Sequence, residues 1–289
     1  MKIENVKTIG VAGAGSMGSG IIQVAAQAGY QVRVFDVSEA MLQKAQKTIG
    51  SSLDRFIKKG TITEEQKGEV LGRIGFSTDV ASLAGAQVII EAVFENVEVK
   101  KDLFSKLGPL LGDDVIIASN TSSLSITEMA SLVKHPENFV GMHFFNPVPM
   151  MKLVEVIPAL QTLPAVTEVA RELGKKFGKT PITCKDTPGF VLNRLLVPYM
   201  MDAIRLVEDG VASPEDIDIA MKLGAGMPMG PLELQDFAGV EIGYYVGDIF
   251  FNYTKDPRFA PPTLLRNMVK AGHVGRKAGR GFYDYSEAK

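Results

Sequence analysis

Short apolar runs alternate with longer amphipathic segments through the first half of the chain. The short runs are rich in β-branched residues, which is typical of buried strands. They are residues 7–12, 31–36, 86–93 and 114–119. Apolar residues at helical spacing follow at residues 17–29, 38–59, 96–111 and 125–133. Strands that alternate with helices predict a doubly wound, Rossmann-like α/β domain with a mostly parallel sheet covered on both faces.

The pattern changes in the second half of the chain. Three more strands are expected at residues 137–145, 152–158 and 180–186, and an Asp-Thr-Pro-Gly cluster then interrupts the chain. From Val191 onward strand-like runs largely disappear, and helices are expected at residues 192–210 and 213–224. We therefore predict an α/β domain at residues 1–184, followed by a smaller all-helical domain at residues 185–289.

Composition and charge narrow the possible partners. The 289-residue chain is 46% hydrophobic, so it can bury a sizeable core, and its formal net charge is −2. This balance gives no general attraction to nucleic acid or acidic membranes, and we expect neither as a partner. Cys184 is the only cysteine, so an internal disulfide cannot form. With no leader-like start and no apolar run long enough to cross a bilayer, we expect a soluble cytoplasmic protein.

A glycine-rich turn follows the first expected strand. Gly13, Gly15 and Gly18 have G-x-G-x-x-G spacing. In such turns the first glycine permits the tight turn, the second lets backbone approach a pyrophosphate, and the third lets the helix pack closely on the sheet. The helix N-terminus then faces the negative charge. Because a strand precedes the turn and a helix follows it, we predict a dinucleotide site. The residues expected at it are Gly13, Ala14, Gly15, Ser16, Met17 and Gly18.

Asp36 ends the second expected strand, about 20 residues beyond the turn. A carboxylate there is placed to accept hydrogen bonds from an adenosine ribose. It would also repel a 2′-phosphate, so NAD is favoured over NADP. The alternative is an ordinary βαβ unit in which Asp36 only caps the next helix.

His143 lies in the stretch GMHFFNPVPMM, and the chain has three histidines. From spacing alone a core histidine is the commoner role. An imidazole is also suited to proton transfer, because it titrates close to neutral pH. His135 and His273 occur in polar, loop-like contexts and are expected at the surface. No His, Cys and carboxylate cluster has metal-ligand spacing, so we predict no metal.

Several stretches taken together make the chain resemble the short-chain L-3-hydroxyacyl-CoA dehydrogenases, and most of all the bacterial 3-hydroxybutyryl-CoA dehydrogenases. They are SNTSS, HFFNPVPMMKLVEV, KDTPGFVLNRLL, MKLGAGMPMGPLEL and GRKAGRGFYDY. The resemblance runs from the first strand to the last few residues. It implies a dinucleotide domain, a helical domain that makes the dimer interface, and an active site between them.

The resemblance also implies a catalytic set. His143 corresponds to the family's catalytic base, and Glu155 to the glutamate that orients it. Ser122 corresponds to the serine that contacts both substrate and nicotinamide, and Asn193 to the asparagine of the GFVLNR stretch. A carboxylate on the second imidazole nitrogen would fix the tautomer and stabilise the imidazolium. Ser122 and Asn193 could donate hydrogen bonds to the substrate oxygen.

The resemblance also implies roles for further residues, whose motifs are less specific. Glu95, Lys100, Asn146 and Lys277 correspond to cofactor contacts. The alternative for Glu95 and Lys100 is a helix-start carboxylate and an exposed lysine.

Ser52 and Lys59 correspond to the family's contacts with the CoA moiety. A lysine there could pair with a nucleotide phosphate, but a lysine near a helix C-terminus is also ordinary favourable charge placement.

The expected activity is the reversible NAD(H)-dependent interconversion of (S)-3-hydroxyacyl-CoA and 3-oxoacyl-CoA, with 3-hydroxybutyryl-CoA and acetoacetyl-CoA as the favoured pair. The resemblance implies a homodimer. One alternative is a dehydrogenase of a free 3-hydroxy acid. The other is a non-catalytic dinucleotide-binding protein on the same fold.

Overall fold

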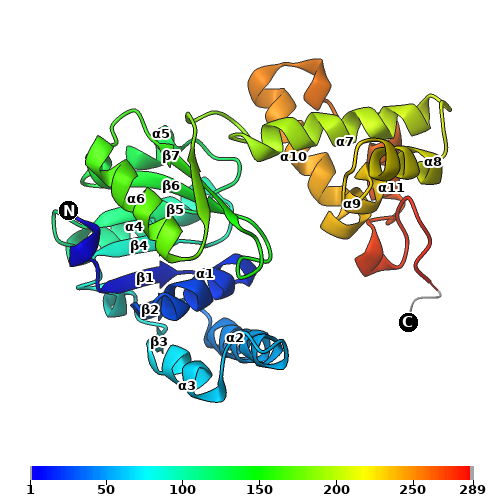
Figure 1. Ribbon diagram of the computed structural model, residues 1–289. Helices are drawn as coiled ribbons and strands as arrows, with labels where there is room; N and C mark the ends of the chain where they lie inside the picture. The colour runs from blue at the N-terminus through cyan, green and yellow to red at the C-terminus, as the bar shows by residue number, and fades with distance from the viewer. Residues whose placement is uncertain (1, 287–289) are drawn as a thin grey trace. The chain divides into compact units, whose positions relative to one another are not determined.

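The computed structural model describes residues 2–286, which form two compact units that divide between Thr187 and Pro188. The expected boundary lay after residue 184. The first unit holds an eight-stranded sheet in the order β3-β2-β1-β4-β5-β6-β7-β8, with β3 at the lower end in Figure 1. Its strands are β1 (Thr8–Ala12), β2 (Gln31–Phe35), β3 (Ile74–Ser77), β4 (Val88–Glu91), β5 (Ile116–Ser119), β6 (Phe139–Phe144), β7 (Leu153–Pro158) and β8 (Thr180–Thr183).

All neighbouring strands run parallel except β6 and β7, which are antiparallel. The mostly parallel, Rossmann-like sheet predicted from the alternating pattern is therefore confirmed. The strand order reverses at β1, which pairs with β2 on one side and β4 on the other. The carboxyl ends of the strands at such a switch point are where open α/β sheets bind their ligands.

Helices cover the sheet on both faces because its strands are apolar on both faces. On one face, buried side chains of α1, α2 and α6 share a core with alternate strand residues such as Val11, Val34 and Val154. On the other, α5 packs on β6 and β7, and Phe104 of α4 meets Phe139 edge to face. The helices of this unit are α1 (Ser16–Gln27), α2 (Glu39–Lys58), α3 (Glu64–Gly72), α4 (Val97–Leu107), α5 (Ile126–Ala130) and α6 (Pro164–Lys176).

The described part of the second unit is built of helices and contains no strand, only the isolated bridges Gly275–Arg280 and Arg280–Asp284. It contains α7 (Leu192–Glu208), α8 (Pro214–Ile219), α9 (Pro231–Ala238), α10 (Val240–Thr254) and α11 (Thr263–Lys270). A π-helical turn, Ala220–Gly224, continues α8. Its core includes Met201, Leu232, Phe250 and Leu265. The all-helical character expected after residue 185 is confirmed.

Two buried carboxylates hold the C-terminal segment of this unit in place. Asp236 accepts hydrogen bonds from the backbone N–H groups of Phe282 and Tyr283 at 2.9 and 3.0 Å. Asp218 accepts one from the Tyr283 hydroxyl at 2.7 Å. A Cβ at Gly281 would lie 2.0 Å from Oδ1 of Asp236, so this close approach requires glycine.

Short 3₁₀ helices complete the secondary structure at Ile3–Asn5, Val80–Leu83, Gly108–Leu110, Pro136–Asn138, Pro257–Phe259 and Arg276–Ala278. No helix within residues 2–286 is long and apolar enough to cross a membrane.

Candidate active site

The carboxyl edge of the parallel strands gathers most of the predicted site residues of the first unit. The glycine turn follows β1, Asp36 follows β2, and Glu91 is the last residue of β4. The SNTSS stretch begins at the last residue of β5, and His143 lies one residue before the end of β6. Segments far apart in the sequence therefore meet because their strands are parallel neighbours.

The three glycines of the turn differ in what surrounds them. Gly13 has φ +103°, and a Cβ there would lie 2.4 Å from the carbonyl oxygen of Ala92. A Cβ at Gly18 would lie 1.9 Å from the Gly13 carbonyl oxygen. These two positions fulfil the structural roles predicted for the first and third glycines. At Gly15 a Cβ would meet nothing within 4 Å, so its glycine leaves open space at the start of α1. An anionic pyrophosphate fits such an uncovered helix N-terminus.

Asp36 braces this turn. Its Oδ2 accepts a hydrogen bond from the Ala14 N–H at 2.8 Å, and its Oδ1 accepts one from the Ser38 N–H at 3.0 Å. The side chain that caps α2 belongs to Ser38, which accepts from the Met41 N–H. The capping alternative for Asp36 is therefore wrong, and its contact with a ribose remains a prediction.

His143 and Glu155 face each other directly across the antiparallel β6–β7 pair. The neighbours Met142, Phe144 and Val154 point into the core under α1 and α6, so the alternation of strand side chains sends both functional residues to the opposite face. Nδ1 of His143 lies 2.8 Å from Oε2 of Glu155. Both are buried, at 5% and 0% exposure.

This arrangement fixes the proton on one imidazole nitrogen. A carboxylate can only accept, so Nδ1 is the donor in this contact. With Nδ1 used in this way, Nε2 is the nitrogen that can exchange a proton with a substrate, and Glu155 is placed to stabilise the resulting imidazolium. The catalytic roles of both residues remain predictions. The ring also packs against Phe145, with centroids 4.4 Å apart. The structure places His143 in a buried position, as the core-histidine interpretation expects, and its role as a catalytic base remains a prediction.

The loop that carries Ser122 is tied to the end of β6. Oδ1 of Asn120 accepts a hydrogen bond from the Phe144 N–H at 2.9 Å. Ser122 lies two residues further along this loop and is partly exposed. Asn120 was not among the predicted site residues, although its place at the end of a buried strand was a usable signal.

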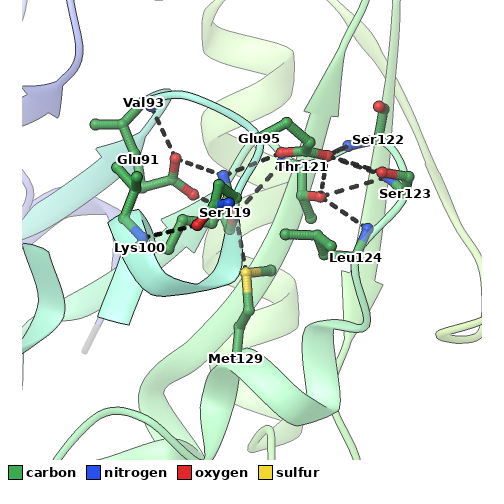
Figure 2. A network of polar contacts seen from close by, with 12 residues as sticks. Glu91, Val93, Glu95, Lys100, Ser119, Thr121, Ser122, Ser123, Leu124 and Met129 are labelled. Carbon is green, nitrogen blue, oxygen red and sulfur yellow. Dashed lines mark hydrogen bonds and ion pairs between the residues drawn. The ribbon is translucent and has the colours of Figure 1, made fainter. Parts of the chain in front are cut away.

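A network of ion pairs and hydrogen bonds around Glu91, Glu95 and Lys100 contacts the same loop (Figure 2). Lys100 is 1% exposed, and its Nζ lies 2.7 Å from Oε1 of Glu91 and 3.2 Å from Oε2 of Glu95. Glu91 also accepts from the Ser119 hydroxyl at 2.5 Å and from the Val93 N–H at 2.8 Å. The exposed-lysine alternative for Lys100 is therefore wrong. Its contact with the cofactor remains a prediction, and Glu91 was not anticipated from the sequence.

Glu95 receives most of its hydrogen bonds from the serine loop. Its Oε1 accepts from the Thr121 hydroxyl, from the Ser122 N–H at 2.9 Å and from the Ser123 hydroxyl at 3.1 Å. Burial by itself would raise the pKa of Glu95, but the Lys100 ammonium and these hydrogen bonds outweigh it and hold the pKa below its ordinary value. Glu95 is therefore ionised at neutral pH while it accepts the hydrogen bond from the Ser122 N–H.

Cys184 lies near the carboxylates of Glu155 and Asp186. Burial, and then the negative charges of Glu155 and Asp186, raise the pKa of its thiol to about 12. Because the thiolate is the nucleophilic form, a thiol in this state does not act as a nucleophile at neutral pH.

An apolar cavity of about 530 Å³ opens between α1, α2 and the loop after β6. Ser52 and Lys59, the two predicted CoA contacts, both line it. Lys59 is also the C-cap residue of α2, so it has the ordinary helix-end placement as well. Asn146 lines the same cavity. The sequence did not point to Arg55, which adds a second positive side chain to the lining.

Asn193 and Lys277 belong to the second unit. Asn193 is the second residue of α7 and is half-buried. Lys277 lies in the Arg276–Ala278 helix, and its ammonium pairs with Glu241. Their contacts with substrate and cofactor remain predictions. Within residues 2–286, no group of three His, Cys, Asp or Glu side chains could hold a metal ion.

A switch-point sheet with a glycine turn, and an imidazole–carboxylate pair at the same edge, define a dinucleotide-dependent dehydrogenase. Comparison with known proteins identifies which one. Residues 8–187 match the family model described as "3-hydroxyacyl-CoA dehydrogenase, NAD binding domain". Residues 189–285 match "3-hydroxyacyl-CoA dehydrogenase, C-terminal domain". The chain belongs to the 3-hydroxyacyl-CoA dehydrogenase family, as its motifs indicated, and its cofactor is NAD.

Relatives match along nearly the whole chain. A probable 3-hydroxybutyryl-CoA dehydrogenase of Deinococcus radiodurans is 46% identical over 276 residues, which cover 96% of this chain and 99% of the relative. The 3-hydroxybutyryl-CoA dehydrogenase of Mycobacterium tuberculosis is 43% identical and covers 98% and 99%. The crystal structure of (S)-3-hydroxybutyryl-CoA dehydrogenase from Ralstonia eutropha has a TM-score of 0.95 at 45% identity, with 98% and 100% covered.

The contrast between Gly15 and Gly18 gives a testable prediction. Gly15→Ala places a methyl group in open space where backbone must approach the pyrophosphate, so we expect normal folding and an NADH Kd raised about tenfold or more. Gly18→Ala forces its methyl group against the Gly13 carbonyl, so we expect a clear loss of thermal stability instead. Melting curves and NADH fluorescence titration of both variants measure the two effects. Normal NADH affinity in folded Gly15→Ala would contradict the assignment of Gly15.

Proposed function

We propose that the protein interconverts (S)-3-hydroxyacyl-CoA and 3-oxoacyl-CoA with NAD(H), and that 3-hydroxybutyryl-CoA and acetoacetyl-CoA are its substrate pair. The observation that carries this proposal is the buried His143–Glu155 pair, with Nδ1 and Oε2 2.8 Å apart at the edge where the cofactor turn lies. The activities named for the relatives, at 43–46% identity, support the choice of substrate.

In the oxidative direction, Nε2 of His143 accepts the proton of the 3-hydroxyl group as the carbonyl forms. NAD, when held at the glycine turn and Asp36, would supply the acceptor for the hydride of the substrate carbon. Glu155 is fully buried beside the imidazole, so it stabilises the imidazolium without competition from water. In the reductive direction the same imidazolium returns the proton to the alkoxide that hydride addition generates.

Ser122 supplies a hydrogen bond to the substrate oxygen, and its loop is held rigid for that task. Three interactions support this role. Asn120 accepts a hydrogen bond from the Phe144 N–H, and Glu95 accepts one from the Ser122 N–H. Lys100 forms an ion pair with Glu95. Preorganised donors of this kind stabilise developing oxyanion charge without reorganisation. We assign the second donor to Asn193 on the resemblance of its motif.

The cavity beside α2 fits the nucleotide end of CoA. Its lining is mainly apolar, with Phe56 and Met150 available to an adenine ring, and Arg55 and Lys59 available to phosphates. A free 3-hydroxy acid would make no use of it. This cavity is what favours a CoA thioester over the free acid, and the catalytic pair is what argues against a non-catalytic protein.

The direct test of this function is NADH oxidation by the purified protein with acetoacetyl-CoA, free acetoacetate or NADPH in separate reactions. We expect rapid turnover only with the thioester and NADH. His143→Gln should lower kcat by about 10²- to 10⁴-fold, the usual range for the loss of a general base. His135→Gln removes an imidazole from the same unit and serves as its control.

The outcomes separate the alternatives. Turnover of free acetoacetate would indicate an acid dehydrogenase, and NADH binding without any turnover would indicate a non-catalytic protein. Near-normal kcat in folded His143→Gln would remove that residue from the proton transfer.

Lys59 and Lys58 offer a matched pair for the CoA cavity. Both lie at the C-terminal end of α2, but only Lys59 lines the cavity. We expect Lys59→Ala to raise KM for acetoacetyl-CoA about fivefold to tenfold, as for one charge-assisted phosphate contact, with KM for NADH unchanged. Lys58→Ala should change neither. Equal effects of the two variants would show that the helix-end charge matters and the cavity does not.

We also propose that the protein is a homodimer that covers one face of α10. Ile242, Tyr245, Ile249 and Tyr253 are between 45% and 69% exposed. They follow one another at spacings of three and four residues, so they form one stripe. The opposite side of α10 is buried, with Val240 and Phe250 in the core. α10 therefore has apolar residues on its exposed side as well as its buried side, and a second copy would cover the exposed ones symmetrically.

Sedimentation equilibrium tests this assembly. The wild type should have twice the chain mass, and a Tyr245→Glu/Ile249→Glu variant should sediment as a folded monomer. Asn267→Glu places one such negative charge on the exposed part of α11 and should remain dimeric. A monomeric wild type would refute the dimer.

A further inference from the structure

The loop between β6 and β7 carries one wall of the apolar cavity. Pro147, Val148, Pro149 and Met150 all line it. The same loop joins the strand of His143 to the strand of Glu155. Its conformation therefore determines part of the shape of the cavity, and it links β6 to β7.

One side of the loop rests directly on the cofactor helix. A Cβ at Gly20 of α1 would lie 2.7 Å from Cβ of Val148 and 3.3 Å from Cδ of Pro149. The loop approaches α1 so closely that only a glycine fits at this position. Contact with α1 blocks inward movement, but contact alone cannot stop the loop from moving outward.

Lys179 fastens the loop from the other side. It immediately precedes β8 and is 7% exposed. Its ammonium donates to the carbonyl oxygen of Val148 and, at 2.8 Å, to that of Met151. These two acceptors lie near the two ends of the cavity wall. Backbone hydrogen bonds from the N–H groups of Met150 and Met151 to the Pro147 carbonyl, at 2.9 and 3.0 Å, close the loop on itself.

The bonding of Lys179 differs from that of the other buried lysine in residues 2–286. Lys100 is paired with two carboxylates, whereas Lys179 makes no ion pair within the described chain. Burial of an ammonium without a counter-charge is unfavourable. Burial, and then the charge of Lys152, accordingly lower the pKa of Lys179 to about 8. A methionine or leucine would fill the space without that cost, but it would leave both carbonyls without a donor.

We propose that Lys179 is a positioning residue that holds residues 147–151 in place as the wall of the CoA-binding cavity. The proposal rests on the proposed function, because it takes this cavity as the site of the CoA moiety. Lys179 does not itself line the cavity, and it contacts the wall through the backbone carbonyls of Val148 and Met151, so its effect on catalysis is exerted through the loop.

Kinetics of Lys179→Met test this role. We expect KM for acetoacetyl-CoA to rise about tenfold, as for the loss of a charge-assisted hydrogen bond. We expect KM for NADH to stay within about twofold, because the predicted cofactor contacts are Asp36, the glycine turn and residues outside 147–151. Lys176→Met removes the same charge from the exposed end of α6, three residues earlier, and should change neither constant. Lys179→Arg keeps a cationic donor and should recover most of the affinity for acetoacetyl-CoA.

Hydrogen–deuterium exchange gives a readout that is independent of activity. In Lys179→Met, the amides of Met150 and Met151 should exchange at least tenfold faster than in the wild type, while the β6 and β7 amides keep their protection. If Lys179→Met does not fold, Lys179→Gln, which retains a neutral donor, replaces it in both measurements.

The outcomes distinguish failure of this proposal from failure of the proposed function. A wild type without activity on acetoacetyl-CoA refutes the function, and faster loop exchange in the variant would then still support the anchoring of the loop. Unchanged loop exchange, or an unchanged KM for acetoacetyl-CoA in an active and folded variant, overturns the role of Lys179. An equal rise in both KM values with a matching fall in kcat also overturns it. So does the same set of changes in Lys176→Met.

Discussion

The reversed pairing of β6 with β7 is the constraint on which the site depends. In a fully parallel sheet, the strand after β6 would return to the opposite edge before it began, and its start would lie far from His143. Because β7 runs antiparallel, it starts at the carboxyl edge, and its third residue, Glu155, lies directly opposite His143. A shift of one residue in this register would turn Glu155 into the core and Val154 or Val156 toward the imidazole. The buried valines on the other face of β7 resist that shift, so core packing holds His143 and Glu155 in register.

In the first unit, the buried charged side chains lie around the candidate site. Ions are costly to bury unless hydrogen bonds and opposite charges compensate. Glu91, Lys100 and Glu155 are essentially inaccessible, and each has a specific partner. Glu91 and Lys100 join the end of β4 to α4, and Glu95 passes that rigidity to the serine loop. Asp186 fixes the other side of the loop, because it accepts from the N–H groups of Ile126 and Thr127 at the start of α5.

The sequence predicted most of the sheet because buried parallel strands have a strong local signal. It did not predict β3, an edge strand with the sequence IGFS whose residues are half-buried or exposed, nor α3 and α6. The glycine roles at Gly13 and Gly18 were predictable, since they follow from backbone geometry at fixed spacing. The role of Lys100 was not, because its two carboxylate partners come from β4 and from the loop after it, and no sequence period records that contact. Lys179 escaped notice for the same reason: its acceptors are backbone carbonyls about thirty residues away.

The chain between His143 and Glu155 also connects the apolar cavity with the His143–Glu155 pair. It leaves β6 beside the His143 imidazole, passes along the cavity and α1, and returns as β7 beside the same imidazole. The cavity wall is therefore connected through the chain to both members of the His143–Glu155 pair. In the proposed reaction, proton transfer depends on that 2.8 Å contact, and a rigid loop would make the geometry of the His143–Glu155 pair insensitive to what fills the cavity. Binding energy from the remote end of a substrate can then align the reacting carbon without disturbing the group that takes its proton.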